Sequence, residues 1–395
     1  MVQKQIVFIE SSPTDMLAKI AQVLKNKGYY TVLISLIGDL ETPFLKSAYS
    51  KRIMLDFKFF KANIKNMPKI GAYSIKKLPF LIKAIIQLKK LRPYLSIVRT
   101  TPNWLCFLVK KSVQSPVIYF PYDIRSFCYN DMGEAISSGV PKFEIKAEKW
   151  CFENCDGIIH KGEDQELSYL NKEILGNIKI KCPIIHFLPY CLSEFLIPLK
   201  NKRIPKREIH IVFVGHIGTE QSWINSINFV LKNKIHLHLY GKTANLSMND
   251  SKKQKEYAAL LNNKYFHIHQ QVDQKDLSKE ISKYDYGIWL GYYDIFRKSI
   301  TICTGNKLAS YLEAGLPIIY FKNHEYIGKI LDTYGAGIGI TINSPLRKIL
   351  ENQNFRRLIS NVQKARKYLT FENNIGRLEK FFEEVRQYKF KKVKQ

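Results

Sequence analysis

The run TGNKLASYLEAGLPIIYF, residues 304–321, combines residue types that bind anions. Thr304 and Gly305 precede a helical pattern whose first turn contains Asn306 and Lys307. The first amide groups of an α-helix have no partners within the helix, and the helix dipole is positive at that end. A lysine ammonium beside these amides adds a full positive charge. The pattern therefore predicts a phosphate-binding helix end.

The same run also contains the signals that end this helix. Gly315 suits the left-handed turn that terminates a helix, and Pro317 prevents the helix from continuing. The four apolar residues that follow, Ile318–Phe321, predict a buried strand.

Two further loops carry residues suited to the same task. In FVGHIGTEQ, residues 213–221, Gly215 and Gly218 would let the backbone approach a ligand closely and present amide groups to an anion. Lys242, in LYGKT, could reach a phosphate. Glycines also end strands simply because the chain must turn, and Lys242 is one of 62 basic residues. Both interpretations stay open at this point.

These loops belong to a chain that alternates strand and helix patterns. Strand patterns occur in the first half as QIVFIE, YTVLIS, LSIVRT, PVIYFPYD and GIIHK, and in the second half as IHIVFVG, IHLHLYG, YFHIHQQV, YGIWLG and PIIYF. Such alternation predicts parallel sheets with helices on both faces. Ligands bind such sheets beyond the carboxyl ends of the strands. We expect an α/β protein with two tandem Rossmann-like domains and a cleft between them.

A basic stretch with two prolines, LIPLKNKRIPKR at residues 196–207, separates the two series of strands. A length of 395 residues also favours two domains. We expect a first domain over residues 1–197, a linker over 198–207, a second domain over 208–372, and a C-terminal helix with a basic tail over 373–395.

The composition is that of a folded protein, with 46% hydrophobic and 13% aromatic residues. The seven cysteines are scattered without C-x-x-C pairs, and we interpret them as reduced thiols. Cys151 and Cys155 lie four residues apart on a predicted helix, which fits small buried residues better than a redox pair. The first apolar run, Ile6–Ile9, is too short for a signal peptide, and no run is long enough to span a membrane. We expect a cytoplasmic protein.

Positive charge is the strongest compositional feature. The net formal charge is +28, and residues 44–92 contain thirteen Lys or Arg against one Asp, a net charge of +12. These basic residues alternate with Phe, Leu, Ile and Met, as in amphipathic helices that lie on membranes. Neither a zinc-finger spacing nor an RNA-recognition signature is present. We expect an anionic membrane surface as the partner, and no nucleic acid. Residues 78–92 also fit an ordinary helix of an α/β unit, with an apolar side that includes Ile82 and Leu88.

Several segments resemble the GT-B glycosyltransferases. NKLASYLEAGLPII followed by YIGKILDTYGAGIGI is similar to their nucleotide-sugar half, in which a helix beginning Asn-Lys or His-Lys leads to Tyr-Leu-x-Ala-Gly-x-Pro, a strand and a Gly-x-Gly element. The segments FVGHIG, SPVIYFPYDIRS and KAEKWCFENCDGIIHKGED are placed as in that family. The likeness spans nearly the whole chain, and its specific part is residues 304–340. It implies a nucleotide-sugar donor in the second half, an acceptor in the first, and membership of the type that builds bacterial cell-envelope polysaccharides.

Two carboxylates of the family pattern are missing. The large retaining branch carries two Glu, separated by seven residues, before the same glycine, and the second binds the ribose hydroxyls. With Gly315 aligned on that glycine, Ile302 and Ser310 occupy the two positions, and Glu313 lies three residues late. Some branches with the Asn-Lys or His-Lys start also lack these acids, so an active enzyme remains compatible with the loss. Ser310 stays in the candidate donor-binding set.

Glycosyl transfer would need little from the side chains. The leaving nucleoside diphosphate develops negative charge, which the helix end and Lys307 would neutralise, so no metal and no other cofactor is expected. An inverting enzyme would also need a general base on the first domain. The candidates are Asp123, after the strand VIYF, and Asp15, in SSPTDML. Asp15 equally fits a helix cap that begins at Ser12, and Asp123 equally fits a turn. His216 is expected to line the donor loop.

The sequence thus predicts a hexosyltransferase-type enzyme that moves a sugar from a nucleotide donor to a lipid-linked or polysaccharide acceptor of the cell envelope. It would work peripherally on the inner face of the membrane. Two alternatives of the same fold remain. A catalytically silent partner protein would explain the missing carboxylates, and a nucleotide-sugar epimerase would not need the basic segment. A nucleic-acid-binding protein would explain the charge but not the nucleotide-type loops.

Overall fold

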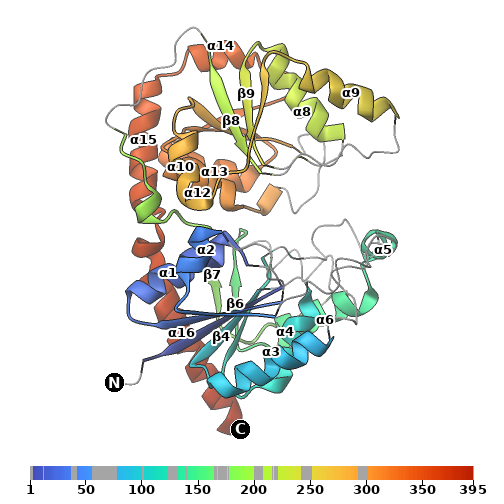
Figure 1. Ribbon diagram of the computed structural model, residues 1–395, viewed down its shortest axis with the longest axis vertical. Helices are drawn as coiled ribbons and strands as arrows, with labels where there is room; N and C mark the ends of the chain where they lie inside the picture. Colours follow the sequence, from blue (N-terminus) through green and yellow to red (C-terminus); the bar gives the residue numbers. More distant parts are fainter. Residues whose placement is uncertain are drawn as a thin grey trace. The chain divides into compact units, whose positions relative to one another are not determined.

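The chain divides into two compact units in the computed structural model (Figure 1). Unit 1 comprises residues 1–188 and 374–395, and unit 2 comprises residues 189–373. The structure describes all residues except 1–2, 12, 37–41, 56–77, 100–101, 123, 125–131, 139, 164–166, 168–175, 177, 200–207, 216, 218–220, 242–250, 292–300 and 395.

Unit 1 is built on a seven-stranded sheet in the order β3-β2-β1-β4-β5-β6-β7, in which neighbouring strands run parallel. Its strands are β1 (Gln5–Glu10), β2 (Tyr30–Ser35), β3 (Lys51–Met54), β4 (Leu95–Arg99), β5 (Val117–Phe120), β6 (Gly157–His160) and β7 (Ile184–His186). The central strand β1 is buried over Ile6–Glu10, as expected for a parallel sheet with both faces covered.

Helices cover both faces of this sheet. They are α1 (Asp15–Asn26), α2 (Pro43–Ala48), α3 (Leu78–Leu91), α4 (Asn103–Ser112), α5 (Met132–Ser137), α6 (Lys142–Asn154) and most of α16 (Phe371–Lys394). Figure 1 shows α3, α4 and α6 together on one face, whereas α1 and α16 lie on the other. Phe381 and Val385 of α16 pack so closely on Gly157 that a side chain there would collide with them.

Unit 2 contains a six-stranded parallel sheet in the order β10-β9-β8-β11-β12-β13. Its strands are β8 (His210–Val214), β9 (His236–Tyr240), β10 (Phe266–His269), β11 (Tyr286–Trp289), β12 (Ile318–Phe321) and β13 (Gly337–Ile340). Its helices are α8 (Gln221–Lys232), α9 (Ser251–Leu261), α10 (Gln274–Ile281), α12 (Asn306–Glu313), α13 (Glu325–Tyr334), α14 (Leu346–Glu351) and α15 (Phe355–Tyr368), with a short 3-10 helix, η5 (Ser193–Phe195).

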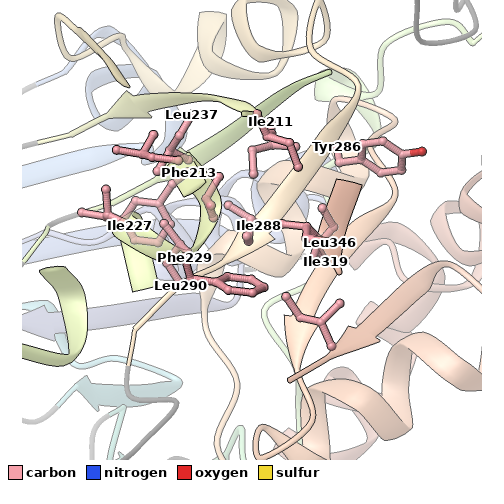
Figure 2. Packing of buried hydrophobic residues seen from close by; sticks show 14 of the residues in the cluster. Ile211, Phe213, Ile227, Phe229, Leu237, Tyr286, Ile288, Leu290, Ile319 and Leu346 are labelled. Atoms are coloured by element: carbon pink, nitrogen blue, oxygen red, sulfur yellow. The ribbon is translucent and has the colours of Figure 1, made fainter. Parts of the chain in front are cut away.

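The core of unit 2 is apolar and continuous. Figure 2 shows Phe213 of β8 and Leu237 of β9 packed with Ile227 and Phe229 of α8. Alternation along each strand sends every second side chain into this core and its neighbours to the opposite face. The opposite face of β8, β9 and β10 therefore carries His210, His236, His238, His267 and His269.

The predicted fold class is confirmed, because both units are α/β with parallel sheets. Each of the ten strand patterns corresponds to a strand. The sequence did not indicate β3, β7 and β13, whose sequences KRIM, IIH and GIGI are short and only weakly strand-like. Cys151 and Cys155 are buried free thiols at the end of α6, in agreement with the prediction.

The predicted start of α1 is wrong. The helix begins at Asp15 and its N-cap is Thr14, whereas Ser12 lies outside the described residues. Thr14 remains extended, and its hydroxyl donates a hydrogen bond to the Glu10 carboxylate, 2.7 Å from Oγ1 to Oε2, instead of capping the helix. The backbone therefore stays extended through Thr14, and Asp15 becomes the first helical residue.

The basic segment 44–92 contributes most of α2 and all of β3 and α3 to unit 1, and its residues 56–77 lie outside the described part. In α3, Ala84 and Leu88 are buried, whereas Ile82 and Ile86 are 51% and 46% exposed. Thus α3 is a helix of the α/β unit, as the alternative interpretation of residues 78–92 predicts, but Ile82 lies on the solvent side. Of the helices in the described residues, none combines the length and apolar character that a membrane crossing requires.

Candidate functional site

A lysine surrounded by aromatic rings stands at the start of α12. The helix begins at Asn306, as its sequence predicts, and Gly305 is an N-cap without a side-chain hydrogen bond. The Nζ atom of Lys307 lies 4.5 Å from the ring centroid of Phe213, 5.4 Å from that of Trp289 and 5.7 Å from that of Trp223. An ammonium over an aromatic face is attracted by the ring quadrupole. The three rings therefore hold one positive charge in a defined position.

Gly215, the residue directly after β8, lies against this lysine. Gly215 has φ +133°, which favours glycine, and a Cβ atom there would lie 2.7 Å from Cε of Lys307. At the end of β9, a Cβ atom on Gly241 would lie 2.0 Å from the carbonyl oxygen of Gly215. Only glycine permits these approaches. The carboxyl ends of β8 and β9 and the first turn of α12 therefore converge, at the edge of the sheet where parallel sheets bind ligands.

Tyr311 fixes α12 to the strands beside it. Its hydroxyl accepts a hydrogen bond from the backbone N–H of Val214 at 3.0 Å and donates one to the carbonyl oxygen of Ile288 at 2.9 Å. Its ring covers Gly287, where a Cβ atom would lie 2.5 Å from the ring. Burial raises the pKa of the Tyr311 hydroxyl well above its usual value, so the side chain stays neutral and keeps its proton for Ile288.

Thr304 and Ser310 differ in what their hydroxyl groups contact. Thr304 is 1% exposed, and its Oγ1 atom has no hydrogen-bond partner among the residues that the structure describes. A buried hydroxyl without a partner is costly, and a ligand oxygen would satisfy it. Ser310 is also buried, but its Oγ donates to the carbonyl oxygen of Asn306 at 3.3 Å, one turn back in the same helix.

Four candidates from the sequence, His216, Gly218, Lys242 and Asp123, lie outside the described residues. The positions that lack the family carboxylates are both buried, since Ile302 is 1% and Ser310 is 4% exposed.

Glu313 has a structural contact. Its Oε1 accepts the backbone N–H of Leu192 at 2.8 Å, and its carbonyl oxygen accepts the N–H of Ile197. Glu313 therefore fastens the segment 192–197 to α12 within unit 2.

A buried carboxylate stands at the carboxyl edge of the sheet in unit 1. Glu10, the last residue of β1, is fully buried, and burial raises its pKa to about 7. Hydrogen bonds from the hydroxyl groups of Thr14 and Tyr49, and the guanidinium of Arg99 at 3.9 Å, oppose this rise by favouring the ionised form. The predicted base candidate Asp15 starts α1 directly beyond this strand.

Two cations share one aromatic ring at the same edge. The guanidinium of Arg99, the last residue of β4, lies 4.7 Å from the ring centroid of Tyr122, and Nζ of Lys161 lies 3.7 Å from it. Arg99 is 13% exposed at its side chain and Lys161 is 5% exposed. Two of these charged residues end strands, Glu10 in β1 and Arg99 in β4, and Lys161 directly follows β6. The sequence interpretation missed all of them, although a charged residue at the end of an apolar strand is a usable signal.

Comparisons with solved structures match this architecture over nearly the whole chain. Sucrose-phosphate synthase from Thermosynechococcus elongatus has a TM-score of 0.69 at 13% identity, and the match covers 96% of this chain and 98% of that chain. A glycosyltransferase from Rickettsia africae ESF-5 has a TM-score of 0.61 at 12% identity, and the match covers 98% of this chain and 99% of that chain. The apo form of the lipopolysaccharide outer core galactosyltransferase WaaB has a TM-score of 0.54 at 11% identity, with the same two coverages. The chain has the GT-B fold. At such low identity the likeness extends to the GT-B fold alone. No family model matches the sequence, and no curated protein is significantly similar to it.

Proposed function

We propose that the protein is a glycosyltransferase that binds a nucleotide sugar with unit 2. The observation that carries the proposal is the convergence of the Lys307 ammonium, the Gly215 loop and the amino end of α12 at one point. A helix amino end with a lysine and a close glycine backbone is suited to a diphosphate.

The chemistry follows from the leaving group. Transfer of the sugar releases a nucleoside diphosphate, whose growing negative charge must be stabilised as the glycosidic bond breaks. Lys307 would supply that stabilisation from a fixed position. Asn306 and Thr304, on either side of the helix start, are the polar groups that would contact the same phosphates, with Gly215 giving access to the backbone. Ser310 stays a candidate, although its hydroxyl bonds to its own helix.

The acceptor half would lie at the carboxyl edge of the sheet in unit 1. Glu10 joins Asp15 and Asp123 as a candidate general base, because a carboxyl group with a pKa of about 7 is half ionised at neutral pH. Arg99 and Lys161 bring positive charge to the same edge, which suits an acceptor that carries a phosphate, such as a lipid-linked glycan. The finer assignment to a hexosyl transfer in the cell envelope belongs to this proposal.

The basic segment would hold the protein to an anionic membrane. Ile82 and Ile86 are exposed one turn apart on α3 and lie beside Lys83, Lys89 and Lys90. Exposed isoleucines flanked by lysines suit the boundary between lipid head groups and acyl chains. We therefore propose peripheral attachment to the inner face of the cell membrane.

A thermal-shift panel of UDP-, GDP-, CMP- and dTDP-sugars tests the proposed function. Stabilisation by one class of donor, followed by sugar transfer that NMR detects in the product, is the expected outcome. If no nucleotide sugar raises the melting temperature, donor binding is refuted. Binding without turnover on any lipid-linked acceptor would instead favour a silent partner protein, which Ile302 at the position of a family carboxylate also favours.

A further inference from the structure

Five histidines form a ladder on one face of the unit 2 sheet. His210 and His236 are directly opposite each other on β8 and β9, and their rings stack at 4.5 Å with an angle of 13°. His238 and His267 are opposite each other on β9 and β10 and stack in the same way at 4.5 Å. His269 continues the series on β10. This face is the one opposite the apolar core.

Hydrogen bonds run diagonally through the ladder. Nδ1 of His210 lies 2.9 Å from Nε2 of His238, and Nδ1 of His236 lies 2.9 Å from Nε2 of His267. Nδ1 of His238 lies 2.9 Å from Nε2 of His269. Which nitrogen carries the proton depends on the tautomers. If His210 and His236 donate from Nδ1, their Nε2 lone pairs are available, and every ring along the ladder stays neutral.

A carboxylate, Glu208, lies beside His210 at the β8 end of the ladder. Oε2 of Glu208 lies 3.9 Å from Nε2 of His210. One ligand atom from each of Glu208, His210 and His236 lies within 4.8 Å of the other two. The Glu208 side chain is 75% exposed and that of His210 is 35% exposed, so an ion can reach them from solvent.

We propose that Glu208, His210 and His236 bind a divalent transition-metal ion such as Zn²⁺. Two imidazoles and a carboxylate are a set of ligands that zinc takes, leaving a fourth position for water. Tetrahedral zinc with bonds of 2.0–2.1 Å needs ligand atoms about 3.3 Å apart. The exposed Glu208 side chain can move to the ion, and the two stacked imidazole rings rotate out of their parallel arrangement so that their Nε2 lone pairs converge on it. His238 and His267 support the ligands, because the Nε2 atom of each accepts a hydrogen bond from the Nδ1–H group of a ligating histidine and so fixes its tautomer.

This site is separate from the proposed donor site. His210 and His236 are the first residues of β8 and β9, whereas Gly215 and Gly241 follow the last residues of the same strands. The metal would therefore bind at the opposite edge of the sheet. It takes no part in the proposed transfer chemistry, which still needs none, and the proposal does not depend on that function.

Isothermal titration of the full-length protein with Zn²⁺ tests the site. The protein should carry no histidine tag, should be freed of metal with a chelator, and should be titrated at pH 7.5. We expect a binding stoichiometry of one Zn²⁺ ion per chain when the protein concentration is in the micromolar range. Zn²⁺ affinity should fall at least about tenfold in each of the variants Glu208→Gln, His210→Gln and His236→Gln. Replacing a residue that only supports a metal ligand already causes a loss of this size. His186→Gln, in unit 1, is the matched control and should bind as the wild type does.

Glu208→Gln should fold as the wild type does, because the Glu208 side chain is exposed and its replacement removes no contact between the histidines of the ladder. A loss of binding in this variant therefore reports on the ligand and not on misfolding. Co²⁺ gives a second readout, since visible absorption bands typical of a tetrahedral ion should appear in the wild type and be lost in His236→Gln. No Zn²⁺ binding by the wild type would overturn the proposal. Wild-type affinity in folded Glu208→Gln and His236→Gln would overturn it as well, because the ion would then be bound elsewhere.

Discussion

Lys307 is the residue on which the proposed function depends most. Lys307→Met removes the ammonium and keeps a side chain of similar length among Phe213, Trp223 and Trp289. One preorganised electrostatic group is worth about 2.7–4 kcal/mol of transition-state stabilisation, or roughly 100- to 1,000-fold in rate. The rings shield the ammonium from water on their side, which weakens dielectric screening. We therefore expect the upper half of that range.

The stability cost of this substitution should be small by comparison. Each cation–π contact contributes about 0.5–1 kcal/mol at a partly exposed site. The methionine thioether packs well against the same rings and is easier to bury than an ammonium, so the melting temperature should fall only slightly. Lys264→Met is the matched control, because its Nζ lies over the ring of Tyr265, 5.1 Å away, and outside the proposed donor site.

The assay combines steady-state kinetics with binding of product fragments. Lys307→Met should bind the nucleoside diphosphate more weakly than the wild type does, but should bind the nucleoside equally well, since only the phosphates meet the ammonium. Lys264→Met should match the wild type in both. A folded Lys307→Met protein with wild-type kcat/KM and wild-type diphosphate affinity would refute the placement of the donor phosphates at α12.

Three further outcomes are expected. Glu10 has a pKa raised from 4.5 to about 7 in the folded state, so its contribution to stability is complete below pH 4.5 and is lost as the pH rises through 7. The free energy of unfolding of Glu10→Gln, measured with urea, should therefore rise by about 3 kcal/mol relative to that of the wild type between pH 4 and pH 8. If the difference in unfolding free energy between the two proteins does not change with pH, the burial of the charge is contradicted. Gly241→Ala places a Cβ atom 2.0 Å from a backbone oxygen and should abolish the donor-induced thermal shift, whereas Gly376→Ala, with nothing within 4 Å, should preserve it. Replacing Ile82 and Ile86 with Ser should weaken flotation with anionic liposomes, and equal flotation with neutral liposomes at high salt would argue against the electrostatic account.

The sequence predicted α12 well because its signals are local. Gly305, Asn306 and Lys307 mark the start of the helix, and Gly315 and Pro317 mark its end, within a dozen residues. Gly315 has φ +72°, as the stop signal requires, and Ile318 begins β12. Elements with such adjacent signals depend little on the rest of the fold.

The strands missed in the sequence depend on partners instead. KRIM at β3 and GIGI at β13 are edge strands whose pairing with β2 and β12 supplies most of their order. The glycines of β13 lower its strand propensity but make room for Tyr320, whose ring lies 3.0 Å from a Cβ atom built on Gly337. That contact joins neighbouring strands and cannot be seen in the run GIGI.

The candidate functional residues that the sequence interpretation missed also depend on contacts between distant parts of the chain. Glu10 ends an apolar strand, and its raised pKa depends on burial among Thr14, Tyr49 and Arg99, which the fold brings together. The histidine ladder is visible in the sequence as IHLHLY and FHIHQQ, because alternate histidines share one face of a strand. Only the register of β8, β9 and β10 makes those faces meet.

In the proposed function, Lys307 of α12 would contact the ligand, whereas other side chains of the helix contact the protein itself. Lys307 faces the Gly215 loop, whereas Tyr311 holds the ends of β8 and β11 and Glu313 holds the segment 192–197. A lysine stem that moved freely would lose rotamer entropy each time it met a phosphate. Here two buried hydrogen-bonding side chains fix the helix, and three aromatic rings fix the ammonium. A charge held in place before the ligand arrives is the kind that lowers a reaction barrier most. In the proposed function, Ile302 and Ser310 in place of carboxylates would therefore leave intact the groups that stabilise the departing nucleoside diphosphate.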